Sequence, residues 1–246
     1  MGQEIILLII IFFAIAVVYS SAGFGGGSSY LAVLSFFDMA FTDLRMITLC
    51  CNITVVVSST ILFNKHLNIE YKRLWPLVIL SVPLAYLGGR FKISEDVFFI
   101  LLGGSLLVAS ILMMVGKVKE KKQLPRFSNA AIGGGIGFLS GVVGIGGGIF
   151  LSPVLHLSRW GKPKVIAATA AIFILVNSIA GLFGQISTNR FSLDITTLLP
   201  LMVSVFIGGQ IGVRTTLFKF SPRVVKQITA FVILIVAVRL LIKYLM

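Results

Sequence analysis

The chain has 246 residues, of which 57% are hydrophobic and 12% are charged, and its formal net charge is +13. Soluble domains carry about 25% charged residues, so this composition excludes an ordinary soluble domain and indicates an integral membrane protein. The basic residues lie in short loops between apolar segments, where they orient the chain and contact anionic lipid, so we expect membrane lipid and no nucleic acid as a partner.

Eight apolar segments follow one another along the chain, without the polar and apolar alternation of barrel strands, so we predict an all-α membrane protein. Six of the segments have the length of a single membrane crossing. The first and the fifth are longer, and each is interrupted by a cluster of glycines. The segments are residues 4–37, 46–63, 74–89, 97–116, 129–157, 165–186, 195–213 and 224–245.

The second half of the chain repeats the first. The cluster "GFGGG" at 23–27 matches "GIGGG" at 144–148, which lies 121 residues later. Further residues recur at offsets of 124 or 125, and the small drift suits short loop insertions. These further matches are Asn52 with Asn177, Pro76 with Pro200, and Arg90 with Arg214.

We therefore predict two structural copies joined by a basic cytoplasmic linker. The first transmembrane copy covers residues 1–116, the linker covers 117–126, and the second transmembrane copy covers 127–246.

The distribution of Lys and Arg bears on the topology. If all eight segments crossed once, the 21 basic residues would divide 11 to 10 between the two sides of the membrane. If the first and fifth segments fold back at their glycines, 15 lie on one side and 6, Arg45 among them, on the other. Positive residues concentrate in cytoplasmic loops, which favours the second topology. Eight plain transmembrane helices are the alternative.

The favoured topology gives each copy a glycine-broken, re-entrant helix pair and three transmembrane helices. Three crossings are an odd number, so the two copies are inverted relative to each other and both termini lie outside. Lipid cannot satisfy a broken backbone, which survives only inside protein or beside a polar cavity. Inverted repeats with broken helices are the usual construction of secondary transporters, whose site lies where the breaks meet.

The glycine breaks predict an anion site. Glycine allows successive N–H groups to turn toward one point, and the helix that starts after each break adds the positive end of its dipole. Serine hydroxyls and two asparagine amides would add donors. The predicted substrate-binding residues are Gly25, Gly26, Gly27, Ser28, Ser29, Asn52, Gly146, Gly147, Gly148, Ser152 and Asn177.

Other glycines and two arginines have simpler interpretations. Gly133, Gly137 and Gly141 lie four residues apart on one helix face, which predicts close helix packing. We predict packing also for Gly103–Gly104 and for Gly208 with Gly212. Arg90 and Arg214 lie at segment ends, where snorkelling anchors are the default and an anion-attracting vestibule is the alternative.

At these residues the sequence resembles the sulfite exporter TauE/SafE family of membrane transporters. The resemblance covers nearly the whole chain and rests on "AGFGGGSSYLAVL", on "SGVVGIGGGIFLSPVL" followed by "AATAAIFILVNSIAGL", and on the two-copy layout. The first motif departs from the family in "SSYLAVL", where versions with proline are common. The resemblance implies transport of a small sulfur-containing anion: sulfite, a sulfonate, sulfoacetate or thiosulfate.

The leading hypothesis is a secondary transporter of the bacterial cytoplasmic membrane, with a passive anion channel or uniporter as the alternative. An enzyme is disfavoured because the chain has neither an HExxH motif nor a serine elbow, and a scaffold would not need two matched breaks. The adjacent Cys50 and Cys51 give no metal-ligand spacing, so we expect no metal or cofactor. A homodimer is expected by analogy with other transporters.

Overall fold

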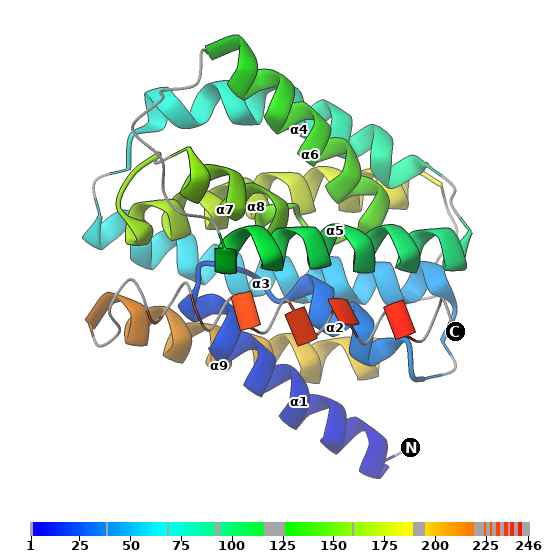
Figure 1. Cartoon of the computed structure of the whole chain (residues 1–246). Coiled ribbons are helices and arrows are strands. Elements are labelled where there is room, and N and C mark those ends of the chain that lie inside the picture. The colour runs from blue at the N-terminus through cyan, green and yellow to red at the C-terminus, as the bar shows by residue number, and fades with distance from the viewer. Residues whose placement is uncertain are drawn as a thin grey trace.

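The computed structural model describes residues 2–37, 39–67, 69–91, 94–115, 126–158, 160–188, 195–218 and ten positions between 224 and 242. These residues form helices and no strand, which confirms the predicted all-α class (Figure 1). The predicted linker lies outside the described residues except for Arg126, where a helix begins. The helices are α1 (Gly2–Ser21), α2 (Gly27–Leu34), α3 (Phe41–His66), α4 (Tyr71–Arg90), α5 (Glu95–Val115), α6 (Arg126–Val143), α7 (Gly148–Leu157), α8 (Pro163–Ile186) and α9 (Ile195–Phe218).

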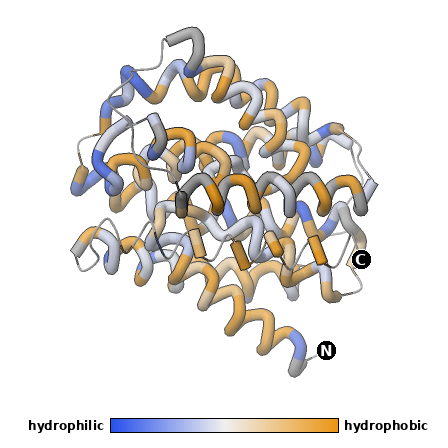
Figure 2. Tube along the Cα trace, in the orientation of Figure 1, coloured by the Kyte–Doolittle hydropathy of each residue, from blue (hydrophilic) through white to orange (hydrophobic). Residues whose placement is uncertain are grey.

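Four stretches of helix in the described part of the chain are long and apolar enough to cross a membrane. Each spans 18 residues or more, which at 1.5 Å per residue approaches the thickness of the hydrocarbon core. Figure 2 shows hydrophobic residues along most of the helix lengths, with hydrophilic residues at ends such as the start of α4. The four stretches are Glu4–Ser21 in α1, Thr42–His66 in α3, Pro163–Ile186 in α8 and Ile195–Leu217 in α9.

The first and fifth apolar segments are both broken at their glycines, as predicted. In the first apolar segment, α1 ends at Ser21 and α2 begins at Gly27. In the fifth apolar segment, α6 ends at Val143 and α7 begins at Gly148. Each break contains glycines with positive φ, a conformation that side chains with a Cβ rarely adopt. We call residues 22–26 the first break and residues 144–147 the second break.

The chain reverses direction at the first break. The rings of Phe12 in α1 and Tyr30 in α2 stack with their centroids 4.5 Å apart. Leu8 near the start of α1 belongs to the same buried cluster as Leu34 at the end of α2. Since α2 thus returns toward earlier turns of α1, the two helices form a hairpin, which is visible in Figure 1.

Two pairs of helices pack closely in a parallel arrangement, α4 with α6 and α1 with α9. On α6, a Cβ at Gly133, Gly137 or Gly141 would collide with the backbone of Leu77, Ser81 or Ala85 of α4, respectively. Gly208 and Gly212 of α9 meet the backbone of α1 at Phe13 and Val17 in the same way. The predicted packing role of these five glycines is therefore confirmed. The packing prediction is wrong for Gly104, where an added Cβ would meet nothing within 4 Å.

Helices α3 and α8 pack against each other in the interior and run antiparallel. Asn52, near the middle of α3, contacts Ser178 of α8. Phe63, toward the end of α3, packs with Ala167 and Ala168 near the start of α8. Both broken segments lie against this central pair, because α2 packs on α3 and α7 packs on α8.

Candidate functional site

The side chain of Asn52 links the two breaks. Its Nδ2 donates hydrogen bonds to the backbone oxygen of Ile145 in the second break (3.1 Å) and to Oγ of Ser178 (3.0 Å). The residue is fully buried at the centre of α3. A buried amide in an apolar helix is costly unless it is bonded, so these contacts fix the second break against α3.

Glycines from both breaks surround this amide. A Cβ on Gly25 would collide with Oδ1 of Asn52, and one on Gly146 would lie 2.7 Å from its Nδ2. A Cβ on Gly27 would lie 3.2 Å from Cα of Ile145, so the start of α2 directly touches the second break. The structure therefore brings the two breaks together, and it leaves no room for a side chain at their contact.

The backbone at both breaks contains left-handed glycines, a conformation from which anion-binding nests are built. Gly26 and Gly147, which precede α2 and α7, have φ values of 92° and 78°. Among the hydrogen bonds between described residues, none uses the N–H groups of residues 25–28 or of residues 146–149. These groups lie at the positive ends of the α2 and α7 dipoles, where a negative charge is stabilised.

Buried hydroxyls gather around the first break. Oγ of Ser29 donates to the hydroxyl of Tyr19 (2.7 Å). Several other buried side-chain oxygens have no hydrogen-bond partner within the described part of the chain, and such groups call for an explanation because each costs stability. They include Ser28 Oγ, Tyr30 Oη, Thr48 Oγ1 and Asn52 Oδ1, together with Ser140 Oγ at the end of α6.

The second predicted amide does not mirror the first. Asn177 is buried in α8, but its Nδ2 donates to the backbone oxygen of Phe173 in the same helix (2.8 Å). Its neighbour Ser178 makes the contact with Asn52 instead. Ser152, another predicted residue, is buried in α7 one turn after Gly148. Ser178 was not predicted, although it stands directly after Asn177 in the sequence.

Arg45 occupies a position that the charge count did not anticipate. It was counted among loop charges, but it lies inside α3 with only 5% of its surface exposed. Its Nη2 donates to the backbone oxygen of Gly141, in the last turn of α6 (2.9 Å). The side-chain amide of Gln185 satisfies its neighbours when its oxygen faces Arg45. In that orientation the Gln185 oxygen accepts a hydrogen bond from Nε of Arg45 (2.8 Å). The guanidinium thus holds the end of α6 against α3 and α8, just before the second break.

The arginines suggested for a vestibule lie elsewhere. Arg90 is the last residue of α4, is exposed, and has its guanidinium 5.8 Å from the centre of the Tyr86 ring. Arg214 is exposed on α9. Both positions suit a snorkelling anchor at the membrane surface.

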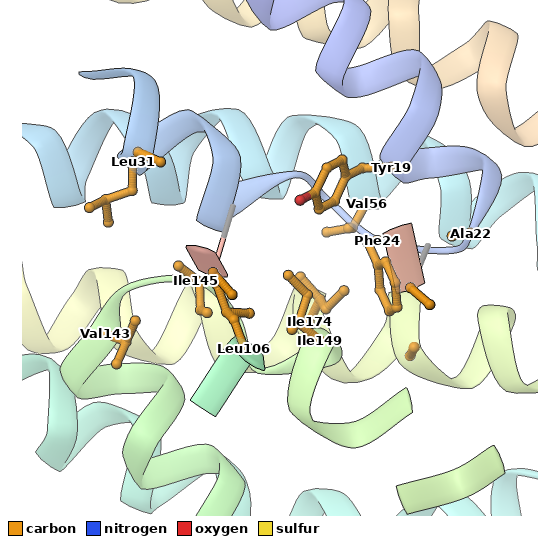
Figure 3. Packing of buried hydrophobic residues seen from close by; sticks show 14 of the residues in the cluster. Tyr19, Ala22, Phe24, Leu31, Val56, Leu106, Val143, Ile145, Ile149 and Ile174 are labelled. Atoms are coloured by element: carbon orange, nitrogen blue, oxygen red, sulfur yellow. The ribbon is translucent and has the colours of Figure 1, made fainter. Parts of the chain in front are cut away.

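Apolar side chains from both halves of the chain close the space around the breaks. Figure 3 shows Tyr19 and Phe24 from the first hairpin, Ile145 and Ile149 from the second, and Ile174 of α8 in one cluster. All residues of both breaks are buried. A groove of about 890 Å³ between α4 and α8, lined by residues such as Trp75, Val82 and Phe183, contains none of them.

The family is decided by comparison of the sequence with known proteins. The family model described as "Sulfite exporter TauE/SafE" matches residues 7–240. The chain belongs to the sulfite exporter TauE/SafE family. It is therefore a multi-pass membrane protein of a transporter family, as the motifs around the two breaks predicted.

Curated TauE/SafE relatives cover most of the chain. The "Probable membrane transporter protein y4hK" of Sinorhizobium fredii is 31% identical over 198 residues, which cover 77% of this chain and 79% of the relative. The "Probable membrane transporter protein MJ0441" of Methanocaldococcus jannaschii is 26% identical, with 82% of each chain covered. "Probable membrane transporter protein YunE" of Bacillus subtilis is 23% identical, with 89% and 90% covered. No solved structure matches this TauE/SafE chain.

Proposed function

We propose that the protein is a secondary transporter of the bacterial cytoplasmic membrane that binds a small sulfur-containing anion between its two glycine breaks. The observation that carries the proposal is the meeting of both breaks at Asn52, with a set of N–H groups on either side that no hydrogen bond between described residues uses. Opposed helix N-termini can hold an oxyanion without a full counter-charge. The description of the family as a sulfite exporter supports this class of anion, such as sulfite, a sulfonate, sulfoacetate or thiosulfate.

Helix directions support two inverted copies. If all eight apolar segments crossed the membrane once, the second segment (α3) and the sixth (α8) would run in the same direction. Their antiparallel packing instead fits two broken hairpins that each enter and leave on one side. The parallel pairs α4 with α6 and α1 with α9 also agree with this topology.

The burial of both breaks favours a transporter over a channel. An open anion channel needs a continuous wet path past its selective donors, whereas the residues at these breaks are covered by the cluster around Phe24, Ile145 and Ile174. An anion can therefore reach the N–H groups only when helices move relative to one another. Such movement around a central site is the mechanism of alternating access.

The chemistry of the site suits a pyramidal oxyanion. Both N–H groups of Asn52 are directed to Ile145 and Ser178, so its role is to hold the breaks together rather than to donate to the substrate. The backbone N–H groups of residues 25–28 and 146–149, which no hydrogen bond between described residues uses, are left to do so. A sulfonate or sulfite presents three oxygens to them, while a planar carboxylate presents two and leaves buried donors unpaired at about 1–3 kcal/mol each.

Uptake into proteoliposomes tests the proposal. We expect saturable uptake of sulfite, thiosulfate or sulfoacetate, with acetate and taurine as weaker competitors, and faster uptake when the same anion is loaded inside. Gly26→Val and Gly147→Val should abolish uptake, because valine disfavours positive φ and crowds the break. Gly135→Ala, where an added Cβ meets nothing within 4 Å, is the control. Uptake that is not accelerated by anion loaded inside would favour a passive channel. Normal uptake by either valine variant would show that the substrate does not bind at the break that carries the substitution.

A further inference from the structure

The two breaks match in their glycines but differ in the side chains that follow. At the repeat offset of 121 residues, Ser28, Ser29 and Tyr30 correspond to Ile149, Phe150 and Leu151. The first turn of α2 therefore carries three hydroxyl groups where the first turn of α7 carries only hydrocarbon. A ligand held between the breaks would meet polar side chains on one side and apolar side chains on the other.

Tyr30 is the most unusual of the three hydroxyl-bearing residues. It is fully buried, and its hydroxyl has no hydrogen-bond partner among the described residues. Tyrosine hydroxyls usually find a partner when buried, because an unmade bond costs the full desolvation of the group. Its ring is fixed by the stack on Phe12, with 19° between the two planes.

The hydroxyl lies beside Gly26 in the first break. A Cβ built on Gly26 would lie 2.8 Å from Oη of Tyr30, and so the hydroxyl closely approaches the backbone of Gly26. Gly26 has positive φ, and none of the hydrogen bonds between described residues uses its N–H or those of Gly25, Gly27 and Ser28. One unpaired O–H donor and a row of unpaired N–H donors therefore share the same small region.

We propose that the Tyr30 hydroxyl donates a hydrogen bond to the bound anion, so that the first break holds the charged oxygens more tightly than the second. This inference rests on the proposed function and adds a specificity-determining residue to it. The second side then contributes the backbone N–H groups of residues 146–149 and an apolar wall that includes Ile149 and Leu151.

Three tyrosine variants of the purified full-length protein test this assignment. Tyr30→Phe removes only the hydroxyl and keeps the stack on Phe12. Tyr19→Phe removes a buried hydroxyl that accepts from Ser29. Tyr71→Phe removes an exposed one that donates to Asn64. For each, calorimetric titration with thiosulfate and sulfoacetate gives Kd, and thermal unfolding without anion gives Tm.

For Tyr30→Phe we expect Kd to rise by about tenfold to a hundredfold, since a hydrogen bond to a charged group is lost. Its Tm without anion should equal or exceed that of the wild type, because the hydroxyl bonds to none of the residues that the structure describes. Tyr19→Phe should lower Tm, and Tyr71→Phe should leave both quantities nearly unchanged.

Two results would overturn the inference while leaving the proposed function intact: a Kd of Tyr30→Phe within twofold of the wild type, or a loss of Tm like that of Tyr19→Phe with unchanged Kd. If the wild-type protein bound neither anion in a saturable way, the proposed function would itself be wrong, and the role of Tyr30 with it.

Discussion

The side chain of Asn52 donates a hydrogen bond to the backbone oxygen of Ile145, 93 positions later in the chain. This bond joins the middle of a long helix in the first half to the irregular backbone of the second half. A break in a membrane helix leaves carbonyl groups that lipid cannot satisfy, so a side-chain donor from a neighbouring helix is needed there.

Replacing Asn52 should therefore loosen the contact between the two breaks. Asn52→Leu removes two hydrogen bonds and takes this donor from the Ile145 oxygen and the Ser178 hydroxyl, at a cost of about 1–3 kcal/mol for each buried group. We expect a lower Tm in detergent and loss of transport. Thr54→Val is the matched control on α3, because the Thr54 hydroxyl donates to the backbone oxygen of Cys50 in its own helix, one turn earlier. Equal Tm values for the two variants would contradict the linking role of Asn52.

The glycines between α4 and α6 offer a comparison within a single helix. Gly137→Ala drives a methyl group into the backbone of Ser81, and such overpacking costs about 1–3 kcal/mol. Gly135→Ala places the same methyl group in open space and should be neutral or stabilising by up to about 1 kcal/mol, since alanine favours the helix. Thermal unfolding should thus give a lower Tm for Gly137→Ala and an equal or higher Tm for Gly135→Ala. A stable Gly137→Ala variant would show that α4 and α6 separate more readily than their contact suggests.

Arg45 should contribute to stability although it lies in an apolar helix. Arg45→Met leaves the Gly141 oxygen and the Gln185 amide without this donor, at about 1–3 kcal/mol for each buried group. Arg45→Lys should be intermediate, because one ammonium cannot reproduce the fork of a guanidinium. The exposed Arg90→Met is the control. Arg45→Met unfolding at the same temperature as Arg90→Met would show that these contacts add nothing.

The inverted topology predicts which loops face the cytoplasm. In a protein whose Cys50 and Cys51 have been replaced, single cysteines at positions 120 and 162 should resist an impermeant reagent added outside cells. A cysteine at position 190 should react with it. The reason is the bias of basic residues toward the first two loops. Strong external labelling at 120 combined with protection at 190 would rule out this topology.

Much of the fold could be predicted because its determinants are local. Glycine clusters that interrupt long apolar segments predicted both helix breaks, and glycines spaced by four predicted the contact of α6 with another helix. These patterns act through backbone conformation and the absence of a Cβ, which are properties of the residues themselves. The pairing of those faces, α4 with α6 and α1 with α9, could not be predicted, since it depends on which surfaces meet in space.

The candidate site was predictable in its backbone and less so in its side chains. Asn52 and Asn177 occupy matching places in the two copies, but one residue bonds across the breaks and the other bonds within its own helix. Arg45 stands one residue before an apolar segment, where a loop position and a buried position look alike in sequence. Tyr30 has the pattern of an ordinary core aromatic, and only its unpaired hydroxyl beside Gly26 distinguishes it.

The pairing of α1 with α9 has a consequence for the synthesis and membrane insertion of the protein. α1 ends at residue 21 and α9 begins at residue 195, a separation of 174 residues. At about 5–20 residues per second, a ribosome needs roughly 10–35 s to deliver α9 after α1 has emerged. Throughout that interval the face of α1 that will receive Gly208 and Gly212 must be covered by lipid, by the insertion machinery or by a temporary neighbour. Although α1 is made long before α9, it is thus among the last helices to reach its final contacts.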